Sequence, residues 1–140
     1  MQTLEEKKTE LTAKLKQIPN KDERLKFIIE QGKAMPPMAD KFKIDQFLVK
    51  GCISKAWLFP QLKDGRILFH ADSEAMIVKG IIAILLQVYS EATPEEVLQE
   101  DGSFLADVGV TEHLSMNRRN GLANVLKMIQ AYATAFKAQS

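Results

Sequence analysis

The sequence predicts an α+β fold in which a small antiparallel β-sheet packs against several helices. Apolar residues recur at helical spacing along most of the chain, and two short β-type segments flank a single Asp64–Gly65 pair. Helical and strand segments also stay separate along the sequence, which is typical of this class. The 140 residues are 46% hydrophobic and 26% charged, so we expect one domain over residues 1–140.

The first two expected elements are amphipathic helices. One lies within residues 1–19 and ends at Pro19, and residues 20–140 make up the rest of the domain. The other begins after Asn20, which forms a capping-box pattern with Glu23, and is ended by Gly32 and the following prolines. Its expected buried face consists of Leu25, Ile28 and Ile29, with Phe27 as a further candidate. Residues 39–54 show no regular period and predict a packed loop.

A β-hairpin is predicted next, with strands over residues 56–62 and 66–71. Asp64 and Gly65 tolerate positive φ and suit the tight turn between the strands. Pro60 has no N–H to donate, so we expect its position to face a free edge of the sheet.

Three more helices follow the hairpin. A helix over residues 74–89, capped by Asp72 or Ser73, is apolar on nearly every side and is expected at the centre of the fold. Thr93-Pro94-Glu95-Glu96 predicts the start of a short helix that ends near Gln99. An irregular segment over residues 102–112 leads to a long last helix capped by Ser115.

Charge and composition exclude several functions. Nineteen basic residues against eighteen acidic ones leave a net charge of +1, which gives no field for collecting nucleic acid or anionic lipid. The charged N-terminus lacks the features of a secretory signal, and the longest apolar run is too short to cross a bilayer. We therefore expect a cytoplasmic protein that binds neither nucleic acid nor a membrane.

Cys52 is the only cysteine in the chain. A single cysteine can form neither an internal disulfide nor a multi-cysteine metal site, so no metal site is expected. Most free cysteines are inert, buried side chains, but Cys52 follows Gly51 in a segment without regular period, where reactive groups concentrate. Nearby Lys50 and Lys55 would favour the nucleophilic thiolate. Any chemistry at this thiol must therefore involve a second molecule.

The start of the last helix breaks two local rules. Arg118 and Arg119 lie where the positive helix N-terminus disfavours cations, and Gly121 lies inside the helix, at a cost of about 1 kcal/mol relative to alanine. Such violations are expected at functional sites. The alternative is that the arginines face solvent or pair with Glu112.

Two other functions stay open on the residues alone. A small cysteine hydrolase or transferase would use Cys52 as its nucleophile and would need His70 or His113 as its base. An adaptor with an inert thiol would work normally without Cys52. Trp57, two residues before Phe59 on a strand, is expected to pack in the core.

Three segments together resemble the SufE family of sulfur-acceptor proteins. They are GCISKAW at residues 51–57, ADSEAMIVKGIIAILL at 71–86 and LSMNRRNGL at 114–122. Their order and spacing fit the family from about Asn20 into the last helix. The resemblance implies a compact α+β fold like that of the iron–sulfur scaffold protein IscU, with the reactive cysteine on a loop beside the sheet.

The resemblance also implies a function. SufE proteins bind and stimulate a pyridoxal-phosphate-dependent cysteine desulfurase of the SufS or CsdA type, accept its persulfide sulfur on their own cysteine and pass it towards iron–sulfur cluster assembly. The protein would then be a carrier and activator and not an enzyme, without a cofactor of its own. Cys52 matches the acceptor, and the other matching positions are Gly51, Ser54, Trp57, Ala75 to Gly80, Arg118, Gly121 and Leu122.

Several further residues qualify the resemblance. Glu74 and Lys79 are candidates for the partner-docking surface, and Arg118 is expected to tether the acceptor loop or meet the desulfurase. The chain departs from the family pattern at Phe47, Ile53 and Met116, which makes the loop more apolar. Gly51 is expected to act as a hinge that lets Cys52 be sheltered in the free protein and extended on docking.

Overall fold

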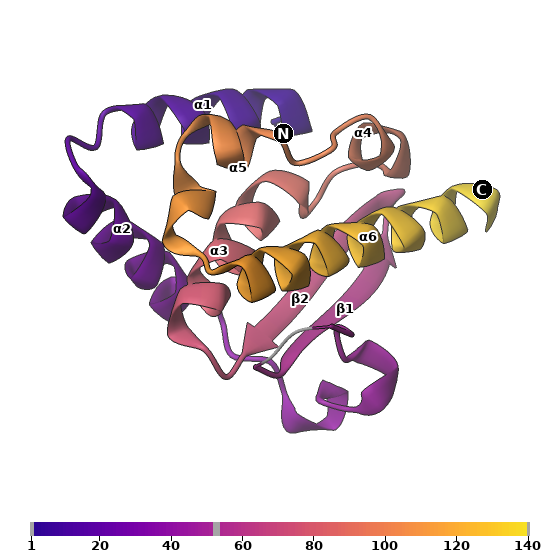
Figure 1. Cartoon of the computed structure of the whole chain (residues 1–140). Helices are drawn as coiled ribbons and strands as arrows, with labels where there is room; N and C mark the ends of the chain where they lie inside the picture. Colours follow the sequence, from indigo (N-terminus) through magenta and orange to yellow (C-terminus); the bar gives the residue numbers. More distant parts are fainter. Residues whose placement is uncertain (1, 52–53, 140) are drawn as a thin grey trace.

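The computed structural model describes residues 2–51 and 54–139 and confirms the α+β class. Its α-helices and the two strands of its antiparallel sheet are α1 (Leu4–Lys16), α2 (Lys21–Ala34), β1 (Ala56–Lys63), β2 (Arg66–Ser73), α3 (Met76–Tyr89), α4 (Pro94–Leu98), α5 (Phe104–Asp107) and α6 (Met116–Gln139). Short 3-10 turns, η1 (Asp40–Phe42), η2 (Asp45–Phe47) and η3 (Val110–His113), lie in the segments between them. Figure 1 shows α6 running across the hairpin and α1 and α2 at the opposite side of the molecule.

The centre of the fold is α3, as the sequence predicts. Nine of its residues are buried, among them Ile84 and Leu85, which have no exposed surface, and the helix contacts α1, α2, α6 and β2. The expected cap at Asp72 or Ser73 is wrong. The cap position is Ala75, which makes no side-chain cap, while Ser73 ends β2 and its hydroxyl accepts a hydrogen bond from the Ala75 N–H at 3.2 Å.

Gly32 does not end α2 as expected, because the helix continues to Ala34. Gly32 instead lies where α2 crosses α3, against Gly80. A Cβ on Gly80 would lie 2.1 Å from the Ile28 carbonyl oxygen, and a Cβ on Gly32 would lie 2.9 Å from the Gly80 nitrogen. The two glycines therefore let the helix backbones approach closely. Ile28 is buried as predicted, but Leu25 and Ile29 are only half-buried.

The hairpin has the predicted turn, with φ of 51° at Asp64 and 78° at Gly65. Its register pairs Ala56 with Ser73 and Lys63 with Arg66. On one face, Leu58 and Ile67 are completely buried. The other face carries Trp57 and Phe59, which are half-buried and lie outside the hydrophobic core, so the expectation that Trp57 packs in the core is wrong.

At three alternate positions of β1, the backbone groups that point away from β2 are either hydrogen-bonded or, at Pro60, lack a donor. The Ala56 carbonyl accepts a hydrogen bond from the Val49 N–H at 2.8 Å, and the Leu58 carbonyl accepts one from the Tyr132 hydroxyl at 3.5 Å. Opposite Pro60, the N–H of Phe69 donates to the Ser90 hydroxyl at 3.0 Å and not across the sheet. This pair therefore directs its backbone groups away from the ladder, which confirms that Pro60 faces the edge.

The predicted packed loop covers the second face of the hairpin. Within it, Phe42 stacks on Phe59 with ring centroids 4.4 Å apart, and Phe47 meets Phe59 edge-on at 4.9 Å. Val49 is buried, whereas Ile44 is 44% exposed. The segment expected to be irregular, residues 102–112, contains α5 and η3, because Phe104, Leu105 and Val110 are buried there.

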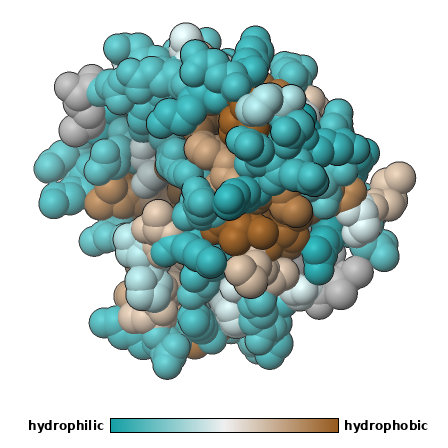
Figure 2. Space-filling view, turned by 90° about the vertical axis from the view of Figure 1, so that its left-hand side faces the viewer, coloured by the Kyte–Doolittle hydropathy of each residue, from teal (hydrophilic) through white to brown (hydrophobic). Residues whose placement is uncertain are grey.

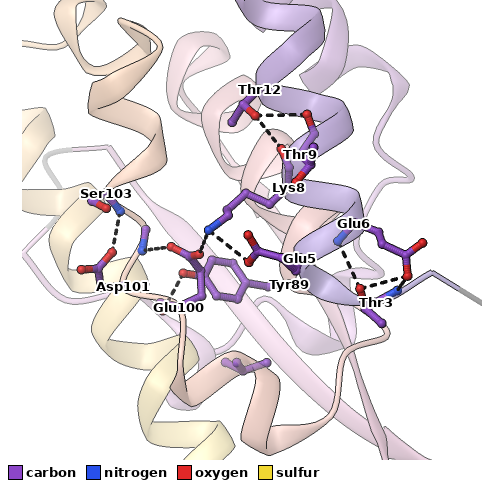
Figure 3. Close-up of polar contacts among 12 residues, drawn as sticks. Thr3, Glu5, Glu6, Lys8, Thr9, Thr12, Tyr89, Glu100, Asp101 and Ser103 are labelled. Atoms are coloured by element: carbon purple, nitrogen blue, oxygen red, sulfur yellow. Dashed lines mark hydrogen bonds and ion pairs between the residues drawn. The ribbon is translucent and has the colours of Figure 1, made fainter.

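Polar contacts attach α1 to α4 and to the segment that follows it, the latter shown in Figure 3. The Lys8 ammonium lies 2.6 Å from buried Glu100, and the Leu4 N–H donates to Glu96 at 2.9 Å. The hydrogen bond to Glu100 raises the pKa of Lys8. Leu4, Leu11 and Leu15 of α1 are therefore buried in the core, and these polar contacts lie at its surface.

The described part of the chain holds no helix with the length and apolar content needed to cross a membrane. Figure 2 shows the face on the left of Figure 1, where an apolar area in the middle of the view is surrounded by hydrophilic side chains.

Candidate functional site

The stretch that contains Cys52 is held at both ends. On one side, Val49 is hydrogen-bonded to Ala56, and Leu48 forms an antiparallel bridge with Trp57. On the other side, the Lys55 carbonyl accepts hydrogen bonds from the Ser73 hydroxyl at 3.1 Å and from the Glu74 N–H at 3.0 Å. The described residues on either side of Cys52 are thus fixed to the hairpin, and we call these two attachments, at Val49 and at Lys55, the loop stem. Cys52 and Ile53 themselves lie outside the described residues.

Gly51, directly before Cys52, has a left-handed backbone with φ of 83°. Its Cα lies against Asn124 of α6, so that a Cβ at this position would be 2.2 Å from the Asn124 Nδ2. The left-handed backbone therefore favours glycine here, and the Asn124 carboxamide would have to shift to admit a Cβ. The contact borders a groove that Lys50 and Lys127 also line.

Ser54, directly after the two residues that are not described, lines a small apolar pocket between α3 and α6. The pocket offers about 20 Å³, room for roughly one water molecule. Ser54 and Arg118 are its polar lining residues, and the apolar walls consist of Val78, Ile81, Ile82, Leu114, Gly121, Leu122 and Val125. Three predicted site residues, Ser54, Arg118 and Gly121, therefore meet at one pocket beside the loop.

The polar residues at the start of α6, where the sequence places two unexpected arginines, make different contacts. Ser115 caps the helix as predicted, since its hydroxyl accepts a hydrogen bond from the Arg118 N–H at 3.3 Å. Arg119 does not pair with Glu112; its Nε donates to the Thr111 carbonyl at 3.0 Å. Glu112 instead pairs with Arg24 at 3.2 Å. Arg118 is half-buried, and its guanidinium makes no hydrogen bond or ion pair to residues 2–51 or 54–139.

Asp72, which was not among the predicted site residues, joins two that were, Trp57 and Lys79. Its carboxylate is buried, at 6% exposure, and lies 3.3 Å from the Lys79 ammonium and 3.2 Å from that of Lys43. The Lys43 ammonium also lies 5.5 Å from the centre of the Trp57 ring, and Trp57 pairs with Asp72 across the hairpin. We call Trp57, Lys43, Asp72 and Lys79 the Asp72 cluster.

The charge of Asp72 is stabilised within this cluster. Burial raises the pKa of the carboxyl, but hydrogen bonds from the Ser73 N–H and from the two lysines lower it by more, so the pKa lies below its usual value. The cluster links the segment before the loop, the strand after it and α3.

Comparison with known proteins identifies the family. The family model described as "SufE: Fe-S metabolism associated domain" matches residues 9–133. The chain belongs to the SufE family. It is 34% identical over 114 residues to an uncharacterized SufE-like protein of Synechocystis, covering 81% of this chain and 72% of that relative. SufE membership associates the protein with iron–sulfur metabolism and sulfur transfer.

The fold of this SufE protein is similar to that of a solved structure. The solution structure of a hypothetical protein from Thermus thermophilus aligns with a TM-score of 0.79, over 92% of this chain and 94% of that one. Because the two sequences are 21% identical, the likeness concerns the fold alone.

The remaining candidates in the SufE chain lie apart from the pocket. Glu74 is exposed and contributes its backbone N–H to the loop stem, whereas its carboxylate meets no partner among the described residues. Of the departures from the family pattern, Phe47 packs in the aromatic contact described above, Met116 is 72% exposed, and Ile53 is not among the described residues.

The two histidines occupy different environments. His70 is exposed on β2 opposite Phe59, and its Nε2 lies 3.3 Å from the Gln61 amide oxygen. His113 precedes Leu114 of the pocket, and its buried Nε2 has no partner among the described residues. Burial lowers the pKa of His113, and the nearby positive charges of Arg24 and Lys21 lower it further. Their distances to Cys52 lie outside the described structure.

Sequence reasoning missed Asp72, Lys43 and Asn124 as parts of this site. Asp72 was considered only as a helix cap, although counting outward from the predicted Asp64–Gly65 turn already places it opposite Trp57. Nothing in the local sequence signals Lys43 or Asn124, because each reaches the site from a segment distant along the chain.

Proposed function

We propose that this SufE protein accepts sulfur as a persulfide on Cys52 from a pyridoxal-phosphate-dependent cysteine desulfurase of the SufS or CsdA type. It then passes that sulfur to an iron–sulfur scaffold or another recipient. In this role it is a carrier and an activator of the desulfurase and has no cofactor of its own. The observation that carries the proposal is the position of the sole cysteine in the sequence. It directly follows Gly51 and comes two residues before Ser54 of the Ser54–Arg118 pocket, and the chain on either side of it is held at the loop stem.

The proposed transfer is a thiol exchange. The Cys52 thiolate attacks the outer sulfur of the desulfurase persulfide, a new S–S bond forms on Cys52, and the original S–S bond breaks. The desulfurase cysteine leaves as a thiolate, so no external oxidant or reductant is needed. Because the chain has no second cysteine, it cannot release the sulfur by forming an internal disulfide. Release therefore requires a second molecule.

The stem limits how far the acceptor can reach. Cys52 comes three positions after Val49. An extended chain spans roughly 3.4 Å per residue, so their Cα atoms are at most about 10 Å apart. The desulfurase persulfide must therefore come within about this distance of the stem. Surfaces next to the loop, including the Ser54–Arg118 pocket, then fall inside the contact area of the partner.

Arg118 suits the charge of the reacting groups. Both the attacking thiolate and the persulfide product are anionic, and a guanidinium beside the loop favours anions of this kind. Its N–H groups make no hydrogen bond to the described residues, so they are available to the loop or to a docked desulfurase.

The direct test is intact-mass spectrometry of the acceptor after incubation with a cysteine desulfurase and L-cysteine. Wild type should gain one sulfur, about 32 Da, which disappears on reduction, whereas Cys52→Ser should gain none. No gain by wild type, with an active and bound desulfurase, would contradict the proposal. A Cys52-dependent hydrolysis that is lost in His113→Ala would then favour the hydrolase instead.

Replacing Arg118 with alanine should lower stimulation of the desulfurase by roughly tenfold, about 1.4 kcal/mol, as expected for loss of one charge-assisted contact. The measurement is the rate of desulfurase turnover as a function of acceptor concentration. Arg119→Ala is the matched control, because this neighbouring arginine lies outside the pocket and donates to Thr111. Equal stimulation by wild type and Arg118→Ala would remove Arg118 from the mechanism.

A further inference from the structure

We propose that Asn124 is a positioning residue for sulfur transfer: its side chain holds Gly51, the residue before Cys52, in the left-handed conformation in which the chain leaves the loop stem. This inference rests on the proposed function. It concerns how the acceptor is presented to the desulfurase and not the chemistry of the sulfur atoms.

The contact is one of shape. A Cβ on Gly51 would lie 2.2 Å from Nδ2 and 3.4 Å from Cγ of Asn124, so the carboxamide fills the space beside the glycine Cα. The φ of 83° at Gly51 independently disfavours any side chain there. Because a glycine without such a neighbour visits many backbone conformations, the carboxamide restricts the residue that is otherwise the freest in the loop.

The part of α6 that carries Asn124 is firmly packed. Its neighbour Val125 and Ile129 one turn later are buried in the core, at 1% and 0% exposure. Further along α6, the Tyr132 hydroxyl donates to the Leu58 carbonyl on β1. The helix α6, which carries Asn124, is therefore attached to the hairpin, which carries the stem. Asn124 contacts Gly51 from this fixed position.

Loss of this contact should affect docking more than chemistry. Without the carboxamide, Gly51 regains backbone freedom, and the loop must lose that freedom again when the desulfurase binds it. The fraction of molecules with a binding-ready loop falls, and the apparent affinity falls by the same factor. Transfer within the assembled complex keeps its rate.

The experiment measures the initial rate of persulfide formation on the acceptor as a function of acceptor concentration. Asn124→Ala should raise the KM for the acceptor at least threefold, with kcat changed by less than twofold. Asn124→Leu keeps the branched shape without the amide and should return KM to within twofold of wild type. Lys127→Ala controls for the loss of another residue of the same groove, and it should raise KM by less than Asn124→Ala does, since Lys127 is not among the nearest atoms to Gly51.

A double substitution isolates the contact itself. Gly51→Ala introduces both the backbone strain and the clash with Asn124, whereas Gly65→Ala has nearly the same φ, 78°, with nothing within 4 Å of its Cβ. Adding Asn124→Ala should partly rescue the KM of Gly51→Ala. The same addition should not improve Gly65→Ala, because no contact is relieved there.

An unchanged KM in Asn124→Ala, failure of Asn124→Leu to restore it, or absence of rescue in the double variant would each overturn the proposal. A wild-type protein that takes up no sulfur would contradict the proposed function separately. The positioning role is then judged by the rate at which iodoacetamide alkylates Cys52 in the free protein. If Asn124→Ala changed this alkylation rate by less than threefold, the positioning role would be overturned in that case as well.

Discussion

Replacing Gly80 with alanine should destabilise the folded protein by at least about 3 kcal/mol, a large part of the total stability of a domain of this size. The new Cβ would lie 2.1 Å from the Ile28 carbonyl oxygen and 2.7 Å from the carbonyl carbon, and neither backbone atom can move without shifting α2. Alanine favours a helix interior by about 1 kcal/mol over glycine, so the propensity alone predicts the opposite sign.

Urea unfolding followed by the fluorescence of Trp57, the only tryptophan, measures this change. Gly65→Ala is the control, because its Cβ would meet nothing within 4 Å, so that it reports backbone strain alone, about 1 kcal/mol. Similar unfolding midpoints for Gly80→Ala and wild type would mean that the helices do not approach as closely as described.

Asp72→Asn should cost about 2 kcal/mol at neutral pH. The substitution keeps an acceptor for the Ser73 N–H but leaves Lys43 and Lys79 without their shared carboxylate. The loss stays below the 3–5 kcal/mol typical of a broken buried pair, because both lysines are partly exposed and can turn to water.

The effect of Asp72→Asn should depend on pH. The pKa of Asp72 is lower in the folded protein than its ordinary value of 3.8, so the ionised carboxylate stabilises the fold above that value. This contribution is lost as the pH falls through the lower, folded pKa. The difference in unfolding free energy between wild type and Asp72→Asn should therefore be constant above about pH 5 and shrink below about pH 4.

Asp40→Asn is the matched control for Asp72→Asn. Asp40 lies 3.8 Å from the same Lys43 ammonium, but its side chain is 99% exposed, so its loss should cost less than about 0.5 kcal/mol at any pH. Equal effects of the two substitutions would show that burial of Asp72 adds nothing to the pair.

Local patterns predicted those elements that local physical chemistry determines. The hairpin turn, the helix start at Thr93, the Ser115 cap and the buried character of α3 all follow from neighbouring residues, and each is confirmed. Gly32 was misjudged as a helix end because its role depends on Gly80, 48 positions later, which no local pattern contains.

The site likewise contains some residues that the sequence predicted and others that it did not. The resemblance selected Ser54, Arg118 and Gly121, and the structure brings these three to one pocket. The Asp72 cluster and the Asn124 contact depend on the hairpin register and on how α6 crosses the sheet. Such tertiary relations become visible only when distant segments are placed together.

The closed edge of β1 affects how this protein behaves among other proteins. An open strand edge invites other chains to add strands, which leads to aggregation. Here Val49, Tyr132 and Pro60 occupy or remove the groups that a foreign strand would need. The hairpin is therefore protected at these positions from seeding intermolecular sheets.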